Sequence, residues 1–308
     1  MARGFRAHFH HSGCGLIATF NQETTMTKSF KPITNLTCMV RVYDEPSRAA
    51  LDQALAIAQH SKAHLIVMIA AAKVSVPFSP AGAWFASPLV GDLNHQTMTK
   101  AKEVAQEVRA KAMAAGISAD IQIMFDHVEN VAEKAIKAAR ISDLVVVDQS
   151  RGRLDTTGIL FEAALFHTGR PVIVASPRKP IFLSVASVTI AWDGSAHAAR
   201  AVGDAISLFP EIKTAHIISI AGEKDLSNTA SGAELAAHLA RKGLKATVET
   251  IDSKGATVGS VLDTYAARAG SDLTIMGGYG KSWLREFIFG GATIELTQSS
   301  IVPLFMAY

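Results

Sequence analysis

The fold is decided by the stretch Ser271-Asp272-Leu273-Thr274-Ile275-Met276-Gly277-Gly278-Tyr279-Gly280, which continues to Gly290-Gly291-Ala292-Thr293. Leu273 to Met276 is a short apolar run between an aspartate and glycines, and this predicts a buried strand. The residues from Ala292 to Ser299 contain no helix breaker and predict a helix. This order of strand, glycine loop and helix N-terminus is typical of an anion-binding site. The glycines let the backbone approach the anion, and the first N–H groups of the helix point at it.

Two common phosphate-binding loops do not fit this stretch. A Walker A loop ending at Gly280-Lys281-Ser282 would need glycine where Ile275 stands, and a dinucleotide fingerprint starting at Gly278 would need glycine where Trp283 stands. What fits is G-x2-G-x9-G, formed by Gly277, Gly280 and Gly290 and followed by a small residue. This pattern resembles the nucleotide-binding motif of the universal stress protein family.

The resemblance implies a binding site for ATP or another adenine nucleotide, with or without Mg, in the C-terminal part of the chain. Asp193 matches the acidic residue of the family at the adenine and ribose end, and Ile220 matches the position whose backbone meets the adenine. The loop that wraps ribose and phosphates would comprise Met276, Gly277, Tyr279, Gly280, Gly290, Gly291 and Ala292. The alternative for Asp193-Gly194-Ser195 is a plain turn and helix N-cap.

The family usually has Ser or Thr where this sequence has Gly291. Loss of one hydrogen bond to a charged group costs about 1.5–3 kcal/mol. At about 1.4 kcal/mol per decade, the phosphates would be held roughly tenfold to a hundredfold less tightly. Thr293, Lys281 and Ser282 are candidates to compensate.

The second half of the sequence repeats the first. Ala63-His64-Leu65-Ile66 recurs as Ala215-His216-Ile217-Ile218, and Ser142-Asp143-Leu144 recurs as Ser271-Asp272-Leu273. Alternating strands and helices predict parallel, doubly wound α/β sheets. The fold class expected is therefore two tandem domains resembling universal stress proteins and the wider adenine nucleotide alpha-hydrolase-like group. Their expected bounds are 34–176 and 183–308.

The repeats differ where ligand binding is expected. Val188 to Trp192 leads to Asp193 as Met39 to Tyr43 leads to Asp44, but the glycine loop is three residues shorter in the first repeat and Asp148 stands in place of Gly277. A carboxylate there would repel a phosphate, so the first domain is expected to be degenerate. The family's pairing through its last strand implies that residues 172–174 lie beside residues 304–306, which gives an internal domain pair. A homodimer is the other assembly considered.

Composition excludes several other classes. Lys and Arg total 30 against 27 Asp and Glu, which leaves no basic footprint for nucleic acid. The apolar run from Leu65 to Ala72 is too short to cross a membrane. Two cysteines, Cys14 and Cys38, cannot form a disulfide framework or a zinc site alone. A cytoplasmic protein is expected.

Two segments stand apart from the repeats. Residues 1–30 lack sustained periodicity and are expected to be a disordered extension; their His8-Phe9-His10-His11 cluster with Cys14 is interpreted as adventitious rather than as a metal site. Residues 73–96 are an insertion of the first repeat, expected to be a loop rich in Pro and Gly ahead of a helix from Met98 to Ala115. Its Phe78, Trp84 and Phe85 either pack on the protein or form a lid or partner surface.

The function expected is that of a nucleotide-binding universal stress protein acting in stress response. No catalytic residues are identified and no metal site is predicted; at most slow ATP hydrolysis is expected. His64 and His216 are expected to form local hydrogen bonds at strand starts. The alternative is an interaction module in which neither repeat binds nucleotide and the paired domains meet protein partners.

Overall fold

The computed structural model describes residues 33–42, 48–75, 83–152, 155–179, 184–221, 230–278 and 291–308. The elements of the first repeat are β1 (Asn35–Arg41), α1 (Ala49–Ser61), β2 (His64–Ala72), α2 (Ala83–Ala114), β3 (Ala119–Asp126), α3 (Val128–Ala139), β4 (Leu144–Asp148), α4 (Thr156–His167) and β5 (Val172–Ala175). Those of the second are β6 (Ser187–Ala191), α5 (Ala196–Leu208), β7 (Thr214–Ile220), α6 (Gly232–Arg241), β8 (Lys245–Ile251), α7 (Val258–Arg268), β9 (Leu273–Gly277), α8 (Gly291–Ser299) and β10 (Leu304–Ala307). The stretch that runs from Ser271 into Gly277 thus forms a strand, as predicted.

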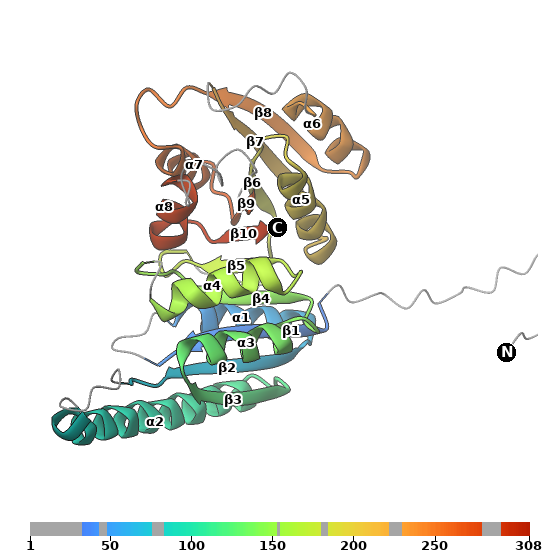
Figure 1. Ribbon diagram of the computed structural model, residues 1–308. Coiled ribbons are helices and arrows are strands. Elements are labelled where there is room, and N and C mark those ends of the chain that lie inside the picture. The colour runs from blue at the N-terminus through green and yellow to red at the C-terminus, as the bar shows by residue number, and fades with distance from the viewer. Residues whose placement is uncertain are drawn as a thin grey trace, which may run out of the picture. The chain divides into compact units, whose positions relative to one another are not determined.

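The strands form one sheet in the order β3-β2-β1-β4-β5-β10-β9-β6-β7-β8 (Figure 1). Within each repeat every pairing is parallel, and the order reverses between the first and fourth strands of that repeat. This confirms the expected doubly wound α/β tandem.

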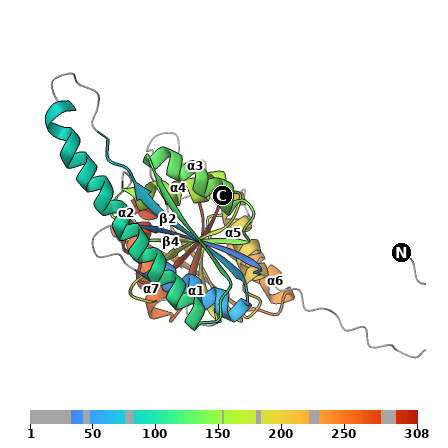
Figure 2. The ribbon, with the colours of Figure 1, turned by 90° about the horizontal axis from the view of Figure 1, so that it is seen from below.

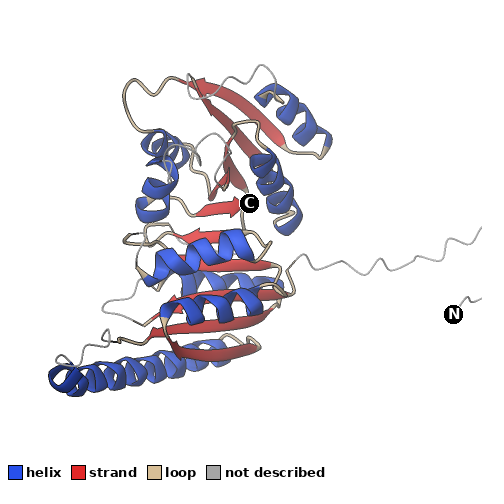
Figure 3. Cartoon of the chain, viewed as in Figure 1, coloured by secondary structure: helices blue, strands red, loops and turns tan. Residues whose placement is uncertain are grey.

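Helices cover both faces of the sheet (Figure 3). One hydrophobic core contains apolar residues of α1, α2, α5 and α6, and the other contains those of α3, α4, α7 and α8. The central strands are buried on both sides, as the burial of every residue of β4 and β5 shows. This burial explains why they are continuous apolar runs rather than alternating ones.

The two repeats join through their last strands. β5 and β10 pair antiparallel, with Val172 opposite Met306, Ile173 opposite Phe305 and Val174 opposite Leu304. The internal pairing that the resemblance implies is therefore confirmed. Phe305 is fully buried there.

The repeated Ser-Asp-Leu sequences fix the start of the first strand in each repeat. Asp143 Oδ2 accepts hydrogen bonds from the backbone N–H groups of Thr34 (2.7 Å) and Asn35 (3.0 Å). Asp272 Oδ2 does the same for Ala186 (2.9 Å) and Ser187 (3.0 Å). These aspartates recur because each carboxylate satisfies two backbone donors at a strand end.

The histidines at the strand starts form local hydrogen bonds, as predicted. His64 Nδ1 lies 2.9 Å from Ser118 Oγ, and His216 Nδ1 lies 3.0 Å from Thr247 Oγ1. Each bond joins neighbouring strands at the side of the sheet away from the expected ligand.

The insertion was predicted wrongly in one respect. α2 begins at Ala83 rather than Met98, and it runs through Pro88 and Gly91. Its later part is anchored on the sheet by buried residues, among them Ala101, Val104 and Val108. Helix propagation is far easier than nucleation, so this anchored part extends the helix backward through residues that disfavour it.

The early part of α2 extends beyond the strands (Figure 2) and leaves Leu89 62% exposed. Residues 76–82 and the side chains of residues 83–88 lie outside the described part, and so do Phe78, Trp84 and Phe85.

Asp143 should make stability depend on pH. Burial alone would raise the pKa of Asp143, but hydrogen bonds from Asn35 and Thr34 outweigh it and lower the pKa below 3.8. A carboxylate whose pKa is lower in the folded state stabilises the fold at every pH above its unfolded pKa. This stabilisation is lost as the pH falls through the folded pKa. Asp143→Asn should therefore lose stability at neutral pH, and the gap to wild type should shrink below about pH 3.8. Urea denaturation between neutral pH and about pH 3 measures this gap. Asp120→Asn, which removes an exposed carboxylate on β3, is the control; a gap for Asp143→Asn that is constant across the range would contradict the assignment.

Candidate functional site

The candidate site lies where the strand order of the second repeat reverses, between β6 and β9. Ala191 pairs with Met276, so Asp193 and Gly277, which follow within two residues, lie at the same carboxyl edge of the sheet. β7 ends at Ile220 at this edge, since Ile218 pairs with Ala191. Open parallel sheets bind ligands at such a switch point.

The segment that follows β6 forms a tight turn into α5. The backbone N–H of Ser195 donates to Asp193 Oδ1 (3.0 Å), and Gly194 has φ +68°. Ser195 is the N-cap of α5, and its hydroxyl accepts from the N–H of Ala198 (3.1 Å). The turn-and-cap interpretation of Asp193-Gly194-Ser195 is therefore correct, and it is compatible with contact to a ligand.

Gly277 allows the first turn of α5 to approach the end of β9. A Cβ at position 277 would lie 2.6 Å from the backbone nitrogen of Ala198 and 2.8 Å from the carbonyl carbon of His197. Glycine is therefore needed here for packing of the protein itself. The consequence is that the positive end of the α5 dipole lies beside the β9 edge.

The other residues of the predicted site differ in burial, and some of them lie outside the described residues. The side chain of Met276 is 8% exposed and belongs to the hydrophobic core, so only its backbone can meet a ligand. Ile220 packs against the same core and is partly buried. Gly291 and Ala292 begin α8, whose first turn contains no acidic residue. Tyr279, Gly280 and Gly290 lie outside the described residues.

Two rings near Gly277 were not found from the sequence. The ring of Tyr308 stacks on that of His197, with centroids 4.4 Å apart and planes 9° apart, and Phe166 of α4 meets Tyr308 edge-on at 4.9 Å. The N–H of Gly278 donates to the carbonyl of Ala307 (2.7 Å), which holds the C-terminal residue at this edge. No sequence pattern signals the stack, because it depends on β10 lying beside β9.

The first repeat carries carboxylates at the corresponding helix N-termini. Asp148, which occupies the position of Gly277, is buried, and its Oδ1 accepts from the backbone N–H of Ala50 in α1 (3.0 Å). Asp155 is the N-cap of α4 and accepts from the N–H of Gly158 (2.6 Å). Donors that could receive an external anion are thus already bound to the protein's own carboxylates.

Two sequence correspondences between the repeats are wrong. Leu36 and Val188 occupy equivalent register positions, because they pair with Leu144 and Leu273. Leu36 also pairs with Leu65, and Val188 with Ala215, so Ala215 corresponds to Leu65 and not to Ala63. Asp193 therefore corresponds to Arg41, not to Asp44, which lies outside the described residues. The guanidinium of Arg41 lies 3.7 Å from Asp155 Oδ2. The charge at this position is thus reversed between the repeats, and in the first repeat it is compensated internally.

The segment after β4 also contacts the second repeat. Gln149 Nε2 donates to the carbonyl of Ser300 (2.7 Å), and the N–H of Ser150 donates to the carbonyl of Thr297 (3.1 Å). Ser176, which follows β5, donates to the same carbonyl of Ser300 (2.8 Å). In the first repeat this segment therefore joins the two halves, whereas residues 279–290, which follow β9 in the second repeat, lie outside the described residues.

The described residues contain neither a cluster of three or more His, Cys, Asp or Glu side chains placed to hold a metal ion nor a helix long and apolar enough to cross a membrane.

Comparison with known proteins identifies the fold. No family model matches the chain, and the curated proteins give no match. Among solved structures, a universal stress protein from Archaeoglobus fulgidus DSM 4304 superposes with a TM-score of 0.63 at 18% identity, covering 88% of this chain and 95% of that one. A functionally unknown protein from Pseudomonas aeruginosa PAO1 superposes with a TM-score of 0.54 at 16% identity, covering 90% and 93%. The chain therefore has the fold of a tandem universal stress protein.

Gly277→Ala tests the packing at the site. The added methyl group meets backbone atoms of α5, which cannot move without displacing the helix, so we expect a loss of about 1–3 kcal/mol in unfolding free energy. Gly203→Ala is the matched control on α5, because nothing lies within 4 Å of its Cβ position. That substitution should stabilise the protein by up to about 1 kcal/mol. Chemical denaturation measures both; equal stabilities would contradict the close approach.

Asp148→Ala tests the cap that the first repeat uses. The N-cap residue of α1, Arg48, makes no side-chain capping bond, so the loss of Asp148 removes the acceptor for Ala50. A lost cap costs about 0.5–2 kcal/mol. Asp148→Asn retains a side-chain oxygen and should cost less. If Asp148→Ala were more stable than wild type in thermal denaturation, relief of a buried charge would outweigh capping.

Proposed function

We propose that the chain is a universal stress protein that binds ATP or another adenine nucleotide in its second repeat and acts in stress response in the cytoplasm. The proposed domains are 34–176, which lacks the site, and 183–308, which contains it, preceded by an extension over residues 1–30. The observation that carries the proposal is the difference between the repeats. Carboxylates bind the N-termini of α1 and α4, whereas a serine caps α5 and glycines lead into α8.

The binding mode follows from the chemistry at the switch point. Asp193 accepts hydrogen bonds from ribose or base, and the backbone at Ile220 meets the adenine. Gly277, Gly280 and Gly290 let main-chain N–H groups surround the phosphates, and the dipoles of α5 and α8 favour negative charge. Met276, Tyr279, Gly291 and Ala292 complete the loop. If Mg accompanies the nucleotide, the phosphates are its main ligands, since protein-bound Mg usually keeps several waters and binds only one or two carboxylates.

A second function, that of an interaction module, is favoured by a specific observation. The segment Asp148-Gln149-Ser150 is used for contact between the repeats, and Gly291 offers a phosphate only its N–H. In this alternative neither repeat binds nucleotide, and the paired domains present a surface to protein partners.

The test is mass spectrometry of protein purified without added nucleotide, followed by calorimetric titration with ATP. Gly280→Glu should abolish binding, because it places a carboxylate and a side chain where phosphates approach the backbone. Gly152→Glu is the matched control: its Cβ position in the first repeat has no neighbour within 4 Å. It should bind as wild type does. Absence of nucleotide and of ATP binding in wild type would leave the interaction module.

A further inference from the structure

The sheet has two outer edges, β3 and β8, because pairing of β5 with β10 takes up the edge strand of each repeat. Within the described residues, β8 pairs only with β7 and β3 pairs only with β2. An edge strand presents a row of backbone N–H and C=O groups to which another strand can add.

The outward-facing backbone groups of β8 follow from its bonds to β7. The N–H of Lys245 donates to Lys213 (2.8 Å), and the carbonyl of Ile251 accepts from Ala221 (2.9 Å). In a parallel ladder alternate residues bond to the same neighbour, so Lys245, Thr247, Glu249 and Ile251 bond to β7. The backbone groups of Ala246, Val248 and Thr250 therefore point away from it.

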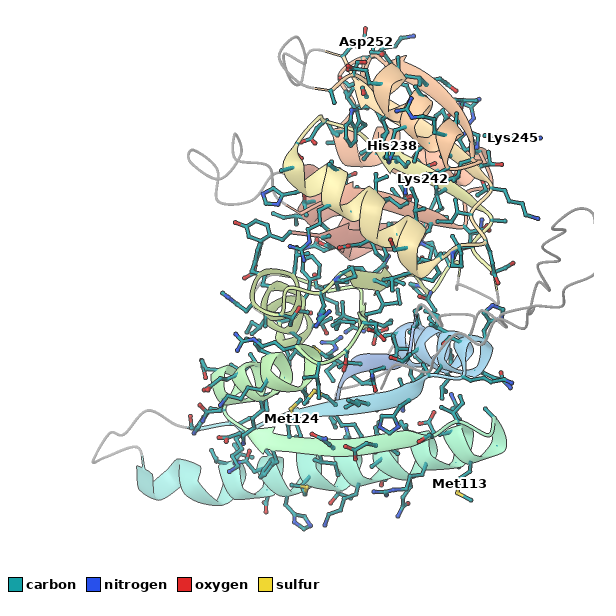
Figure 4. The ribbon with its side chains drawn as sticks, turned by 90° about the vertical axis from the view of Figure 1, so that its right-hand side faces the viewer. Met113, Met124, His238, Lys242, Lys245 and Asp252 are labelled. Atoms are coloured by element: carbon teal, nitrogen blue, oxygen red, sulfur yellow. The ribbon has the colours of Figure 1, made fainter. Side chains whose placement is uncertain are left out.

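The two ends of β8 carry opposite charges. Lys242 and Lys245 lie at its start, whereas Glu249 and Asp252 lie at its end, as Figure 4 shows for the three of these that it labels. Glu249 is held in place, since its Oε1 accepts a hydrogen bond from the hydroxyl of Tyr265 (2.6 Å). An antiparallel copy of the same strand would bring each basic end against an acidic one.

One register satisfies both the backbone and the charges. Centred on Thr247, it places Ala246 opposite Val248 of the copy, and these outward-facing residues can exchange N–H···O bonds. It also places Lys245 opposite Glu249 of the copy in a non-hydrogen-bonded pair, in which side chains lie closest. The other edge lacks this complementarity: the charged residues of β3 are Asp120 and Asp126, both acidic, so antiparallel self-pairing along β3 forms no ion pair between the copies.

We propose that β8 is the contact between two copies of this chain, which associate as an antiparallel, two-fold dimer through Lys245, Thr247 and Glu249. The same pair of residues then forms two ion pairs per dimer, because an isologous contact uses each residue twice. The ten-stranded sheet of one copy continues into that of the other.

The experiment is sedimentation velocity of the full chain over a range of concentrations. Wild type should approach about twice the chain mass of 32.7 kDa, and high ionic strength should shift it toward the monomer. Lys245→Glu should weaken association at least about tenfold, because it opposes two carboxylates at both ends of the contact. Adding Glu249→Lys to it should restore the dimer. Lys102→Glu, the same charge change on an exposed face of α2, should leave the mass unchanged.

A second variant tests the backbone contact. Ala246→Pro removes an outward-pointing N–H but none of the bonds to β7, so it should abolish the dimer while the melting temperature changes little. The proposal is overturned if wild type sediments as a monomer at every concentration, or if its dimer persists in both Lys245→Glu and Ala246→Pro. A dimer that survives both substitutions uses another surface. If wild type is a monomer, β8 is not a contact between copies of this chain.

Discussion

The antiparallel ladder between β5 and β10 is the constraint on which the rest of the structure depends. It joins two five-stranded halves into one sheet, places the fully buried Phe305 between them and brings α4 beside the end of β9. It also holds the C-terminal residue where Tyr308 can stack on His197. Because β5 and β10 pair with each other, the edges of the sheet in the described residues are β3 and β8.

Much of this architecture could be predicted from the sequence. Buried parallel strands are continuous apolar runs, and the repeated Ser-Asp-Leu marks the start of the fourth strand in each half, so element order and the tandem repeat could be read directly. The early half of α2 could not. Pro88 and Gly91 oppose a helix locally, and only anchoring of the residues that follow on the sheet overrides them.

The position of the switch point at the carboxyl edge of the sheet was predictable from the order of strands and helices. The glycine spacing predicts a ligand loop after β9, but the structure gives Gly277 a further reason, its close approach to α5, which no local pattern encodes. Sequence comparison matches Asp193 with Asp44, because Asp44 is the first aspartate after β1. Strand pairing instead places Arg41 at the position that corresponds to Asp193. The His197–Tyr308 stack required the tertiary arrangement.

The bond between Asp148 and the N-terminus of α1 makes this position hard to convert to glycine. Replacement of Asp148 by glycine leaves the first turn of α1 without its acceptor, since Arg48 provides none. A glycine at position 148 therefore needs a capping residue at position 48 to accompany it. Gly277 in the second repeat carries no such requirement, because Ser195 caps α5.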